Sequence, residues 1–435
     1  MHDPARPLGT SVGRRRDRAE RGGLADRQHH GTAICPVWMN GAEMPCKASG
    51  EGPGSHIAAI RSARRMTQEE LALAAHISLS LLRKIEQGTR TPSDPVLDAV
   101  AAALNVDPSR LLGNSTRLDS RVHDAIPAFR EVIATYDIPD EGPVRPMPGL
   151  RTAVTDAVQK RLSAQYVRLS QTLPELLGEL IRGMHAPGDP ADISALLVAA
   201  YRAADAVAYK YGYLDLSARL IELMRQTSAP AEDPLLSAST AYVRTEVFFA
   251  ARTYQAGLRA LESAIDQLPR KAERLRLGVL GSLHMRAAVI AARAANADAA
   301  MTHLRQARQL GDQVPEDIYY GTAFGPCSVR VHEVSVALGL GDRHLQHALT
   351  LVGDWSPPPE MHAERRSGFF IDLARAQLWA GQKDAAFESL LTARRIAPQH
   401  TREHPWVRED VKTLLRLHRS SGQNLVSFAE WVGAV

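Results

Sequence analysis

The chain has few residues of the kinds that build disulfide-bonded, metal-binding or membrane-spanning proteins. It has three cysteines in 435 residues, Cys35, Cys46 and Cys327, and none forms a CxxC pair, which predicts reduced thiols. Aromatic residues make up only 5% of the chain. No run of about eighteen apolar residues occurs, and the polar start lacks the apolar core of a signal peptide. We therefore expect a cytoplasmic protein with no membrane span.

Motifs of common catalytic sites are also missing. The chain has no GxSxG nucleophile turn, no GxxxxGK[ST] phosphate loop and no HExxH zinc motif. His344 and His347 are three residues apart, with His332 nearby, but the sequence does not locate a third metal ligand. A solvated helix face explains these histidines better than a metal site. The sequence therefore predicts no enzyme, no cofactor and no metal.

The most informative stretch that is present covers residues 67–88 and reads TQEELALAAHISLSLLRKIEQG. Thr67, followed three residues later by Glu70, forms the capping-box pattern that begins a helix. Ser78 is a good N-cap for a second helix, and a glycine follows the end of that helix. The stretch predicts two short helices joined by a tight turn, which is the layout of a helix-turn-helix.

Each of the two helices has an apolar face. The residues at helical spacing that predict the buried faces are Leu71, Ala74 and Ala75, then Leu81, Leu82 and Ile85. The outward row of the second helix comprises Ser80, Arg83, Lys84 and Gln87. Short polar groups, cations and an amide are what a helix in a DNA major groove needs to meet base edges and phosphates. The alternative is an ordinary helical hairpin with a solvated charged face.

The flanking segments complete a small helical domain. A helix before the motif carries Ile57, Ile60 and Ala63, and an apolar run at 96–104 and a short turn at 107–112 follow it. With these flanks, residues 57–113 resemble the helix-turn-helix of the XRE family, to which the phage lambda repressor and Cro belong. The resemblance implies a five-helix, repressor-like domain whose partner is double-stranded DNA.

The resemblance also implies which residues contact DNA. Gln68 matches a position that contacts backbone phosphate and braces base readout. The exposed recognition-helix positions are matched by Leu79, Ser80, Arg83 and Lys84. The loop that touches phosphate after the recognition helix is matched by Gln87, Thr89, Arg90 and Thr91.

Two positions depart from the family pattern. His76 stands in the turn where glycine is usual, and histidine tolerates a positive φ at modest cost, so we expect the turn to survive. Leu79 stands where a polar base reader is common. It either contacts a thymine methyl group or packs against the domain.

The charge of this domain gives no strong overall field. Residues 55–113 carry seven Lys and Arg against six Asp and Glu, and the whole chain has a net charge of +4. Affinity for DNA must then come from individual cations, namely Arg61, Arg64, Arg65, Arg83, Lys84 and Arg90. We expect modest affinity for each monomer and therefore a homodimer on paired half-sites.

Composition divides the chain into four parts. Residues 1–54, rich in Gly, Pro and Arg, predict a disordered basic tail. Residues 55–113 form the DNA-binding domain. Residues 114–148 predict a linker with a short helix at 122–136. The segment DIPDEGPVRPMPG follows that helix, and its four prolines and two glycines indicate a linker. Residues 149–435 read as helix after helix, without strand-like alternation.

An internal repeat organises this last part. The segments QAGLRALESA, DAAMTHLRQA and DAAFESLLTA each place two small residues seven apart: Gly257 and Ala264, Ala300 and Ala307, Ala386 and Ala393. A degenerate copy, GDRHLQHALTLV, lies at 341–352. Small residues let neighbouring helices approach closely, and stacked helical hairpins bury a core that one hairpin cannot. This predicts an α-solenoid, with a helix bundle of accidental alanine periodicity as the alternative.

Residues 230–435 resemble the tetratricopeptide-like region that follows such a helix-turn-helix in many actinobacterial regulators. Segments such as YGTAFGPCSVRVHEVSVALGLGD carry the resemblance. Two local questions stay open here. Tyr319, Tyr320 and Phe324 either line a concave groove or pack between repeats. The run 364–366, Glu-Arg-Arg, either forms internal salt bridges or binds an anion.

The sequence as a whole predicts an all-α protein: a repressor-like DNA-binding domain followed by an α-solenoid of tetratricopeptide-like hairpins. We expect a cytoplasmic, nucleoid-associated transcriptional regulator that places residues 78–87 in the major groove. Its repeat domain would dimerise, bind a peptide or small-molecule effector, or do both. The alternative is a protein-interaction scaffold whose helix-turn-helix binds DNA weakly or binds a protein partner.

Overall fold

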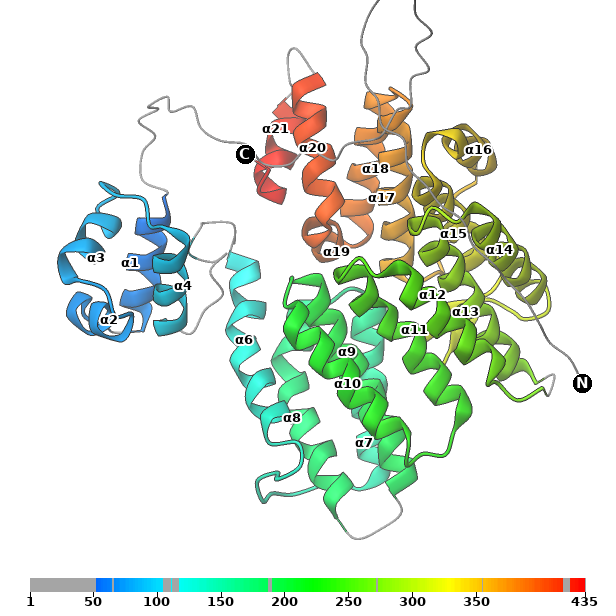
Figure 1. The fold of residues 1–435 in the computed structure, drawn as a ribbon, viewed down its shortest axis with the longest axis horizontal. Coiled ribbons are helices and arrows are strands. Elements are labelled where there is room, and N and C mark those ends of the chain that lie inside the picture. The colour runs from blue at the N-terminus through cyan, green and yellow to red at the C-terminus, as the bar shows by residue number, and fades with distance from the viewer. Residues whose placement is uncertain are drawn as a thin grey trace, which may run out of the picture. The chain divides into compact units, whose positions relative to one another are not determined.

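The structure is a computed structural model. The residues it describes are 52–64, 66–104, 111, 117–186, 190–270, 273–353, 355–417 and 423–434. Most of the predicted disordered tail lies outside the described residues, and so does most of the predicted fifth helix of the DNA-binding domain. Within the described ranges the prediction of an all-α fold is confirmed (Figure 1).

Four short helices form the N-terminal helical domain. They are α1 (Pro53–Ala63), α2 (Gln68–Ala74), α3 (Leu79–Glu86) and α4 (Asp94–Ala103). Helix α3 packs against α1 and α2, and α2 packs against α4, around a core of their own apolar side chains. The predicted apolar face of α2 was partly wrong: Ala74 is exposed, and Ala72 is buried beside Leu71.

The C-terminal helices pair as six hairpins in the described residues. The hairpins are α7 (Met147–Leu162) with α8 (Tyr166–His185), α9 (Pro190–Lys210) with α10 (Leu214–Ser228), α11 (Pro234–Ala250) with α12 (Tyr254–Asp266), α13 (Arg274–Arg293) with α14 (Ala297–Gly311), α15 (Pro326–Leu340) with α16 (Asp342–Val352), and α17 (Ala363–Trp379) with α18 (Lys383–Ile396). Three further helices follow: α19 (Pro398–Glu403), α20 (Pro405–Leu417) and α21 (Gln423–Val432). The stacked hairpins confirm the predicted solenoid.

Each hairpin reverses through one residue in the left-handed backbone region. These residues are Ala164, Gly212, Arg252, Ala295, Gly341 and Gly381, with φ between 54° and 85°. Behind Ala295, the Asn296 amide donates to the Ala291 carbonyl at 3.0 Å, which satisfies a carbonyl that the helix end leaves open. The equivalent bond recurs after Ala164, Gly212, Arg252 and Gly381. Gly341 differs, because its ψ is -168° and its own amide donates to the Leu338 carbonyl. One turn geometry therefore serves five of the six hairpins.

The small-residue pairs fall on the second helix of three hairpins, α12, α14 and α18. Gly257, Ala300, Ala307, Ala386 and Ala393 are buried, and Ala264 is half-buried. The degenerate copy at 341–352 covers α16, where Ala348 is buried but Gly341 is the turn residue. The pattern missed the first two hairpins because larger residues occupy three of the four equivalent positions. Five and twelve residues after their turn residues stand Leu169 and Leu176 in α8, and Ser217 and Met224 in α10. All four are buried, so the packing persists where the small residues do not.

The first helices of the six hairpins form an inner layer that closes on itself. Each of α7, α9, α11, α13, α15 and α17 packs against the next, and α17 also packs against α7. Polar contacts from neighbouring helices, α9 to α17 and α8 to α19, also join the first and last parts of the array. Lys210 and Glu364 form an ion pair at 3.2 Å, and the Val167 amide donates to Gln399 Oε1 at 3.0 Å. We call these six helices the inner ring.

The segment predicted to be a linker contains a helix of the repeat domain. Helix α6 (Arg117–Ala134) packs against α8 and α9. Its residues Val122, Ile126, Phe129 and Ile133 are buried in the same core as the first hairpins. The proline-rich segment that follows α6 therefore joins two helices of one core.

A two-stranded hairpin departs from the expectation of helices alone. Strands β1 (Asp317–Tyr319) and β2 (Thr322–Phe324) pair antiparallel between α14 and α15. Tyr319 and Phe324 are buried over Gly278 and Gly281 of α13, where a Cβ atom would lie 2.2 and 2.0 Å from the rings. These two aromatic residues therefore pack between repeats, and only glycine permits the approach.

Helix α13 has the length and apolar composition of a membrane span, with a mean hydropathy of 1.3. In the structure 61% of its apolar window is buried within the protein. It packs against α11, α12, α14 and α15, as a core helix of the repeat domain does.

Candidate nucleic-acid interface

Two capping motifs fix where α2 and α3 begin. The Glu70 amide donates to Thr67 Oγ1 at 3.1 Å, and the Thr67 amide donates to Glu70 Oε2 at 2.7 Å. These bonds from Thr67, the backbone one foremost, hold the pKa of the Glu70 carboxyl below its usual value. At α3 the Ser78 hydroxyl oxygen accepts from the Leu81 amide at 3.2 Å. Both predicted caps are confirmed.

The turn between the two helices runs through His76. Its φ is 51°, in the left-handed region where glycine is usual, and the Ile77 amide closes the turn on the Ala72 carbonyl at 3.0 Å. Histidine therefore holds the turn that the sequence assigned to it, at a modest cost in backbone strain. The turn sets the direction of α3 relative to α2.

The outward row of α3 is exposed as predicted, and it comprises Ser80, Arg83, Lys84 and Gln87. The opposite face, with Leu82 and Ile85, is fully buried in the domain core. Leu79 is half-buried and packs against that core, while part of it remains accessible. The helix therefore presents a polar, cationic face from a rigid base.

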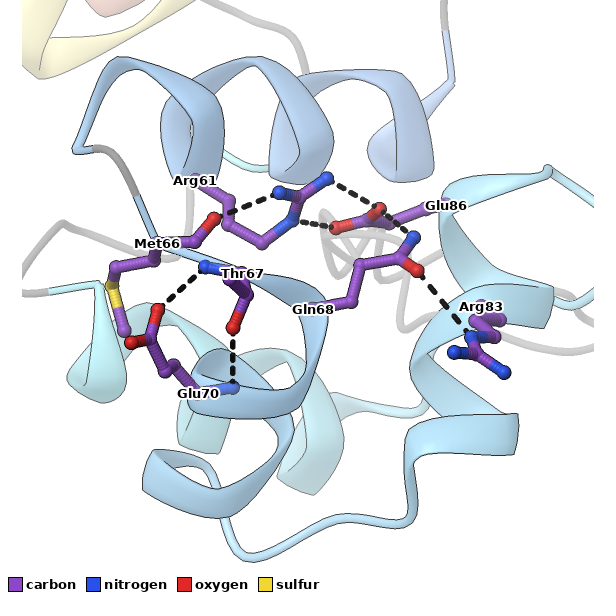
Figure 2. A network of polar contacts seen from close by, with 7 residues as sticks. All are labelled: Arg61, Met66, Thr67, Gln68, Glu70, Arg83 and Glu86. Atoms are coloured by element: carbon purple, nitrogen blue, oxygen red, sulfur yellow. Dashed lines mark hydrogen bonds and ion pairs between the residues drawn. The ribbon is translucent and has the colours of Figure 1, made fainter.

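Beneath this face lies a network of polar contacts shown in Figure 2. The Glu86 carboxylate accepts from Arg61 Nε at 2.7 Å and from Arg61 Nη2 at 3.0 Å. It also accepts from Gln68 Nε2 at 2.7 Å, and Gln68 Oε1 lies 3.4 Å from Arg83 Nε. Arg61 further donates to the Met66 carbonyl at 2.9 Å. One buried carboxylate thus ties α1, α2 and α3 together and orients Gln68 and Arg83.

The prediction that Arg61 supplies affinity for DNA was wrong. Its side chain is only 15% exposed and its guanidinium is committed to Glu86, which is 5% exposed. The hydrogen bond to Glu86 raises the pKa of Arg61 further. A signal for Glu86 was present in the sequence, because a carboxylate in the last turn of a helix opposes the helix dipole unless a cation pairs with it. Arg65 lies outside the described residues.

The loop after α3 is also exposed. Thr89, Arg90 and Thr91 all face solvent. The Thr89 hydroxyl donates to the Lys84 carbonyl at 2.9 Å, and the amides of Thr89 and Arg90 donate to the same carbonyl. The start of the loop is thereby held against the C-terminal end of α3. The nine residues implied by the resemblance therefore lie on α2, α3 and the adjoining loop.

Comparison with known families and proteins covers mainly this domain. The helix-turn-helix family profile HTH_3 matches residues 57–111. The chain is 43% identical over 63 residues to the immunity repressor protein of Bacillus phage phi105, and it spans 44% of that protein. It is 40% identical over 58 residues to YazB of Bacillus subtilis (strain 168), an uncharacterized HTH-type transcriptional regulator, and it spans 84% of that protein. These matches cover 14% and 13% of the present chain.

Solved structures give weaker similarities over longer ranges. Bacillus thuringiensis PlcR, solved with the peptide PapR7 and DNA, is 18% identical, with 61% of this chain and 95% of that chain covered and a TM-score of 0.30. The apo form of ComR from Streptococcus vestibularis is 11% identical, with 88% and 99% covered and a TM-score of 0.28. These TM-scores are too low to establish a common overall fold.

Proposed function

We propose that this chain binds a specific operator through its N-terminal domain. The chain belongs to the helix-turn-helix family of DNA-binding transcriptional regulators. In this proposal α3 and its caps, residues 78–87, lie in the major groove. Ser80, Arg83 and Lys84 face base edges and nearby phosphates, and Leu79 meets a thymine methyl group or supports the helix. Regulation of transcription by the whole chain is part of the same proposal.

The observation that carries the proposal is the exposed α3 face held by the Glu86 network. A side chain that reads a base must keep its position before DNA arrives, and the contact from Gln68 to Arg83 supplies that preorganisation. Gln68 keeps an exposed part for a phosphate. Gln87, Thr89, Arg90 and Thr91 would contact phosphates, which fix register without reading sequence.

The remaining parts of the proposal concern the repeat domain. We assign it dimerisation, recognition of a peptide or small-molecule effector, or both, since paired half-sites offset the modest charge of one DNA-binding domain. The domain boundaries at 55–113 and 149–435 belong to this proposal, with α6 added to the repeat domain. The protein would act in the cytoplasm at the nucleoid, without catalytic activity.

The decisive experiment is selection of bound sequences from a random DNA pool with the full-length protein. A palindromic enriched site would identify the operator and a dimer. The Arg83→Ala/Lys84→Ala double variant should lose the enrichment, because it removes two exposed cations of the α3 face.

A matched control is Arg305→Ala, which removes an exposed arginine of the repeat domain. It should select the same site as the unmodified protein. If the unmodified protein is folded and enriches no sequence at any salt concentration, the regulator proposal fails and the scaffold alternative takes its place.

A further inference from the structure

Six side chains, one from each helix of the inner ring, form a cationic cluster inside the repeat domain. The cluster comprises Arg161 of α7, Arg202 of α9, Tyr242 of α11, Arg286 of α13, His332 of α15 and Arg365 of α17. Arg161, Tyr242 and His332 are 7%, 7% and 6% exposed, and the other three are partly accessible. We call this set the interior arginine cluster. It contains four guanidinium groups drawn from positions up to about two hundred residues apart in sequence.

Two of these arginines hold the turn of the β1–β2 hairpin. Arg161 Nη2 donates to the Gly321 carbonyl at 2.6 Å, and Arg202 Nη1 donates to the Tyr320 carbonyl at 2.7 Å. Arg202 Nη2 also donates to Thr322 Oγ1 at 2.6 Å. All three acceptors are neutral oxygens, so they satisfy donors but do not balance charge. Arg161 Nε is buried and has no hydrogen-bond partner.

Three arginines, Arg202, Arg286 and Arg365, surround Tyr242. The Arg286 and Arg202 guanidinium carbons lie 5.0 and 5.6 Å from the centre of its ring. Arg365 also acts on the Tyr242 hydroxyl, and its Nη1 lies 2.9 Å from His332 Nε2. Burial raises the pKa of Tyr242, but these three guanidinium groups outweigh it and hold the pKa below the usual value. The lowered pKa of the Tyr242 hydroxyl therefore reflects a strongly positive environment.

His332, the histidine of the cluster, is neutral and neither adds to nor offsets the positive charge of the arginines. His332 Nδ1 lies 2.8 Å from the Ser328 carbonyl, and its Nε2 faces Arg365, which can only donate. Nδ1 therefore carries the proton and Nε2 accepts. Burial and then Arg365 lower the pKa of His332 well below its ordinary value, so the ring is neutral.

The nearby carboxylates are fewer than the arginines. Glu246 lies 3.7 Å from Arg286. Glu364 forms an ion pair with Lys210. Burial raises the pKa of Glu364, but the charges of Lys210, His400, Arg161 and Arg365 outweigh burial and lower this pKa to about 2, so Glu364 is a charged neighbour of the cluster. Burial, and then the charge of Glu246, raise the pKa of Asp205 well above its ordinary value, which disfavours its charged form. Among the residues that the structure describes, Arg161, Arg202 and Arg365 have no carboxylate within ion-pair distance. Four arginines and Lys210 therefore share two charged carboxylates, Glu246 and Glu364. Buried cations in excess of their counter-charges are costly, and such an excess is typical of sites that bind a charged ligand.

From these contacts we infer that the interior arginine cluster is the recognition site for a small effector bearing an oxyanion, either a phosphoryl or a carboxylate group. Arg161, Arg202 and Arg365 bind the oxyanion, and the Tyr242 hydroxyl orients it. Planar guanidinium groups bind both kinds of oxyanion through paired hydrogen bonds. The oxyanion competes with the neutral carbonyls of Tyr320 and Gly321, so binding loosens the β1–β2 turn from α7 and α9. This inference rests on the proposed effector role of the repeat domain.

The test is scanning calorimetry of the full-length protein in inorganic phosphate, in sodium acetate and in sodium chloride at equal ionic strength. At a hundredfold excess over Kd, a bound oxyanion should raise the Tm of the repeat domain by about 4 °C above the chloride value. Phosphate acting more strongly than acetate indicates a phosphorylated effector, and the reverse order indicates a carboxylate.

Variants locate the site. Arg202→Gln and Arg365→Gln should each abolish the excess shift, whatever they do to the Tm in chloride. Arg365→Lys keeps the charge and should retain part of the shift, which also guards against a variant that merely folds poorly. Arg305→Gln, an exposed arginine of α14, should keep the full shift. Arg83→Ala should keep it too, since the α3 face belongs to another domain.

Two results would overturn the inference: no excess shift for either oxyanion, or a full excess shift in both glutamine variants. The DNA selection described above separates this inference from the proposed function. If the protein binds an operator but shows no oxyanion effect, only the proposed effector site is ruled out. If it shows an oxyanion effect but selects no operator, only the proposal of a transcriptional regulator is ruled out.

Discussion

Replacing Glu86 with alanine should destabilise the N-terminal domain by about 3 kcal/mol, because it leaves a mostly buried cation without a partner. Glu86 accepts three hydrogen bonds, two from Arg61 and one from Gln68, and the two charged side chains are 5% and 15% exposed. Breaking one partner out of a buried ion pair costs about 3–5 kcal/mol, and the residual exposure of Arg61 places this pair at the lower end. A domain of this size has a free energy of unfolding of about 3–8 kcal/mol, so most of it would be lost.

Hydrogen–deuterium exchange of the full-length protein measures this effect locally. Amides of α1 and α3 should exchange about 100-fold faster in Glu86→Ala, while those of α13 should be unchanged. Glu69→Ala is the matched control, since Glu69 is an exposed carboxylate of the same domain. Affinity for the selected operator should fall as well, because Gln68 and Arg83 lose their support. Exchange within threefold of the unmodified protein would refute the reasoning that this ion pair holds the domain together.

Three further perturbations test other parts of the structure. Arg83→Ala should cost about 1–3 kcal/mol at the selected operator and little on unrelated DNA, whereas Arg90→Ala should weaken binding to both alike and reduce the salt slope by about 1; fluorescence anisotropy at several salt concentrations measures both. Ala295→Gly should stabilise the repeat domain by about 0.5–1 kcal/mol, since alanine is strained at a φ of 56°, and a lower urea midpoint would contradict this. Burial raises the pKa of Asp410 from 3.8 to about 7, because Arg375 at 3.8 Å is too distant to offset it. The folded chain then holds a proton that the unfolded chain releases, so stability should fall as pH rises from about 4 to 7, and Asp410→Asn should flatten this part of the urea-midpoint profile.

Local features of the helix-turn-helix were predictable because they depend on neighbours in sequence. The caps at Thr67 and Ser78 need only the next three residues, and the turn at His76 needs one tolerant side chain. The exposed row of α3 follows from helical phase alone. The role of Arg61 did not follow, because its partner Glu86 is 25 residues away and helical phase gives no distance between helices.

The repeat domain shows the same limit on a larger scale. Pairs of small residues marked three hairpins, but Leu169, Leu176 and Met224 occupy equivalent buried positions in α8 and α10, so the pattern did not identify these two helices. Strands of three residues are too short to show an alternation of apolar and polar residues, so the sequence did not predict the hairpin at 317–324. Nothing in the sequence brings Arg161 near Arg365, since their helices meet only when the last hairpin returns to the first. The interior arginine cluster therefore required the structure.

The contact between the first and last helices of the inner ring limits how this protein can change through gene duplication. An open array of hairpins can gain or lose a unit at its end at the cost of one interface. Here an added hairpin would have to separate α7 from α17 and break the Lys210–Glu364 pair. The number of hairpins is thus held by a geometric constraint. Diversification within this lineage should proceed by substitutions inside the ring rather than by copying its units.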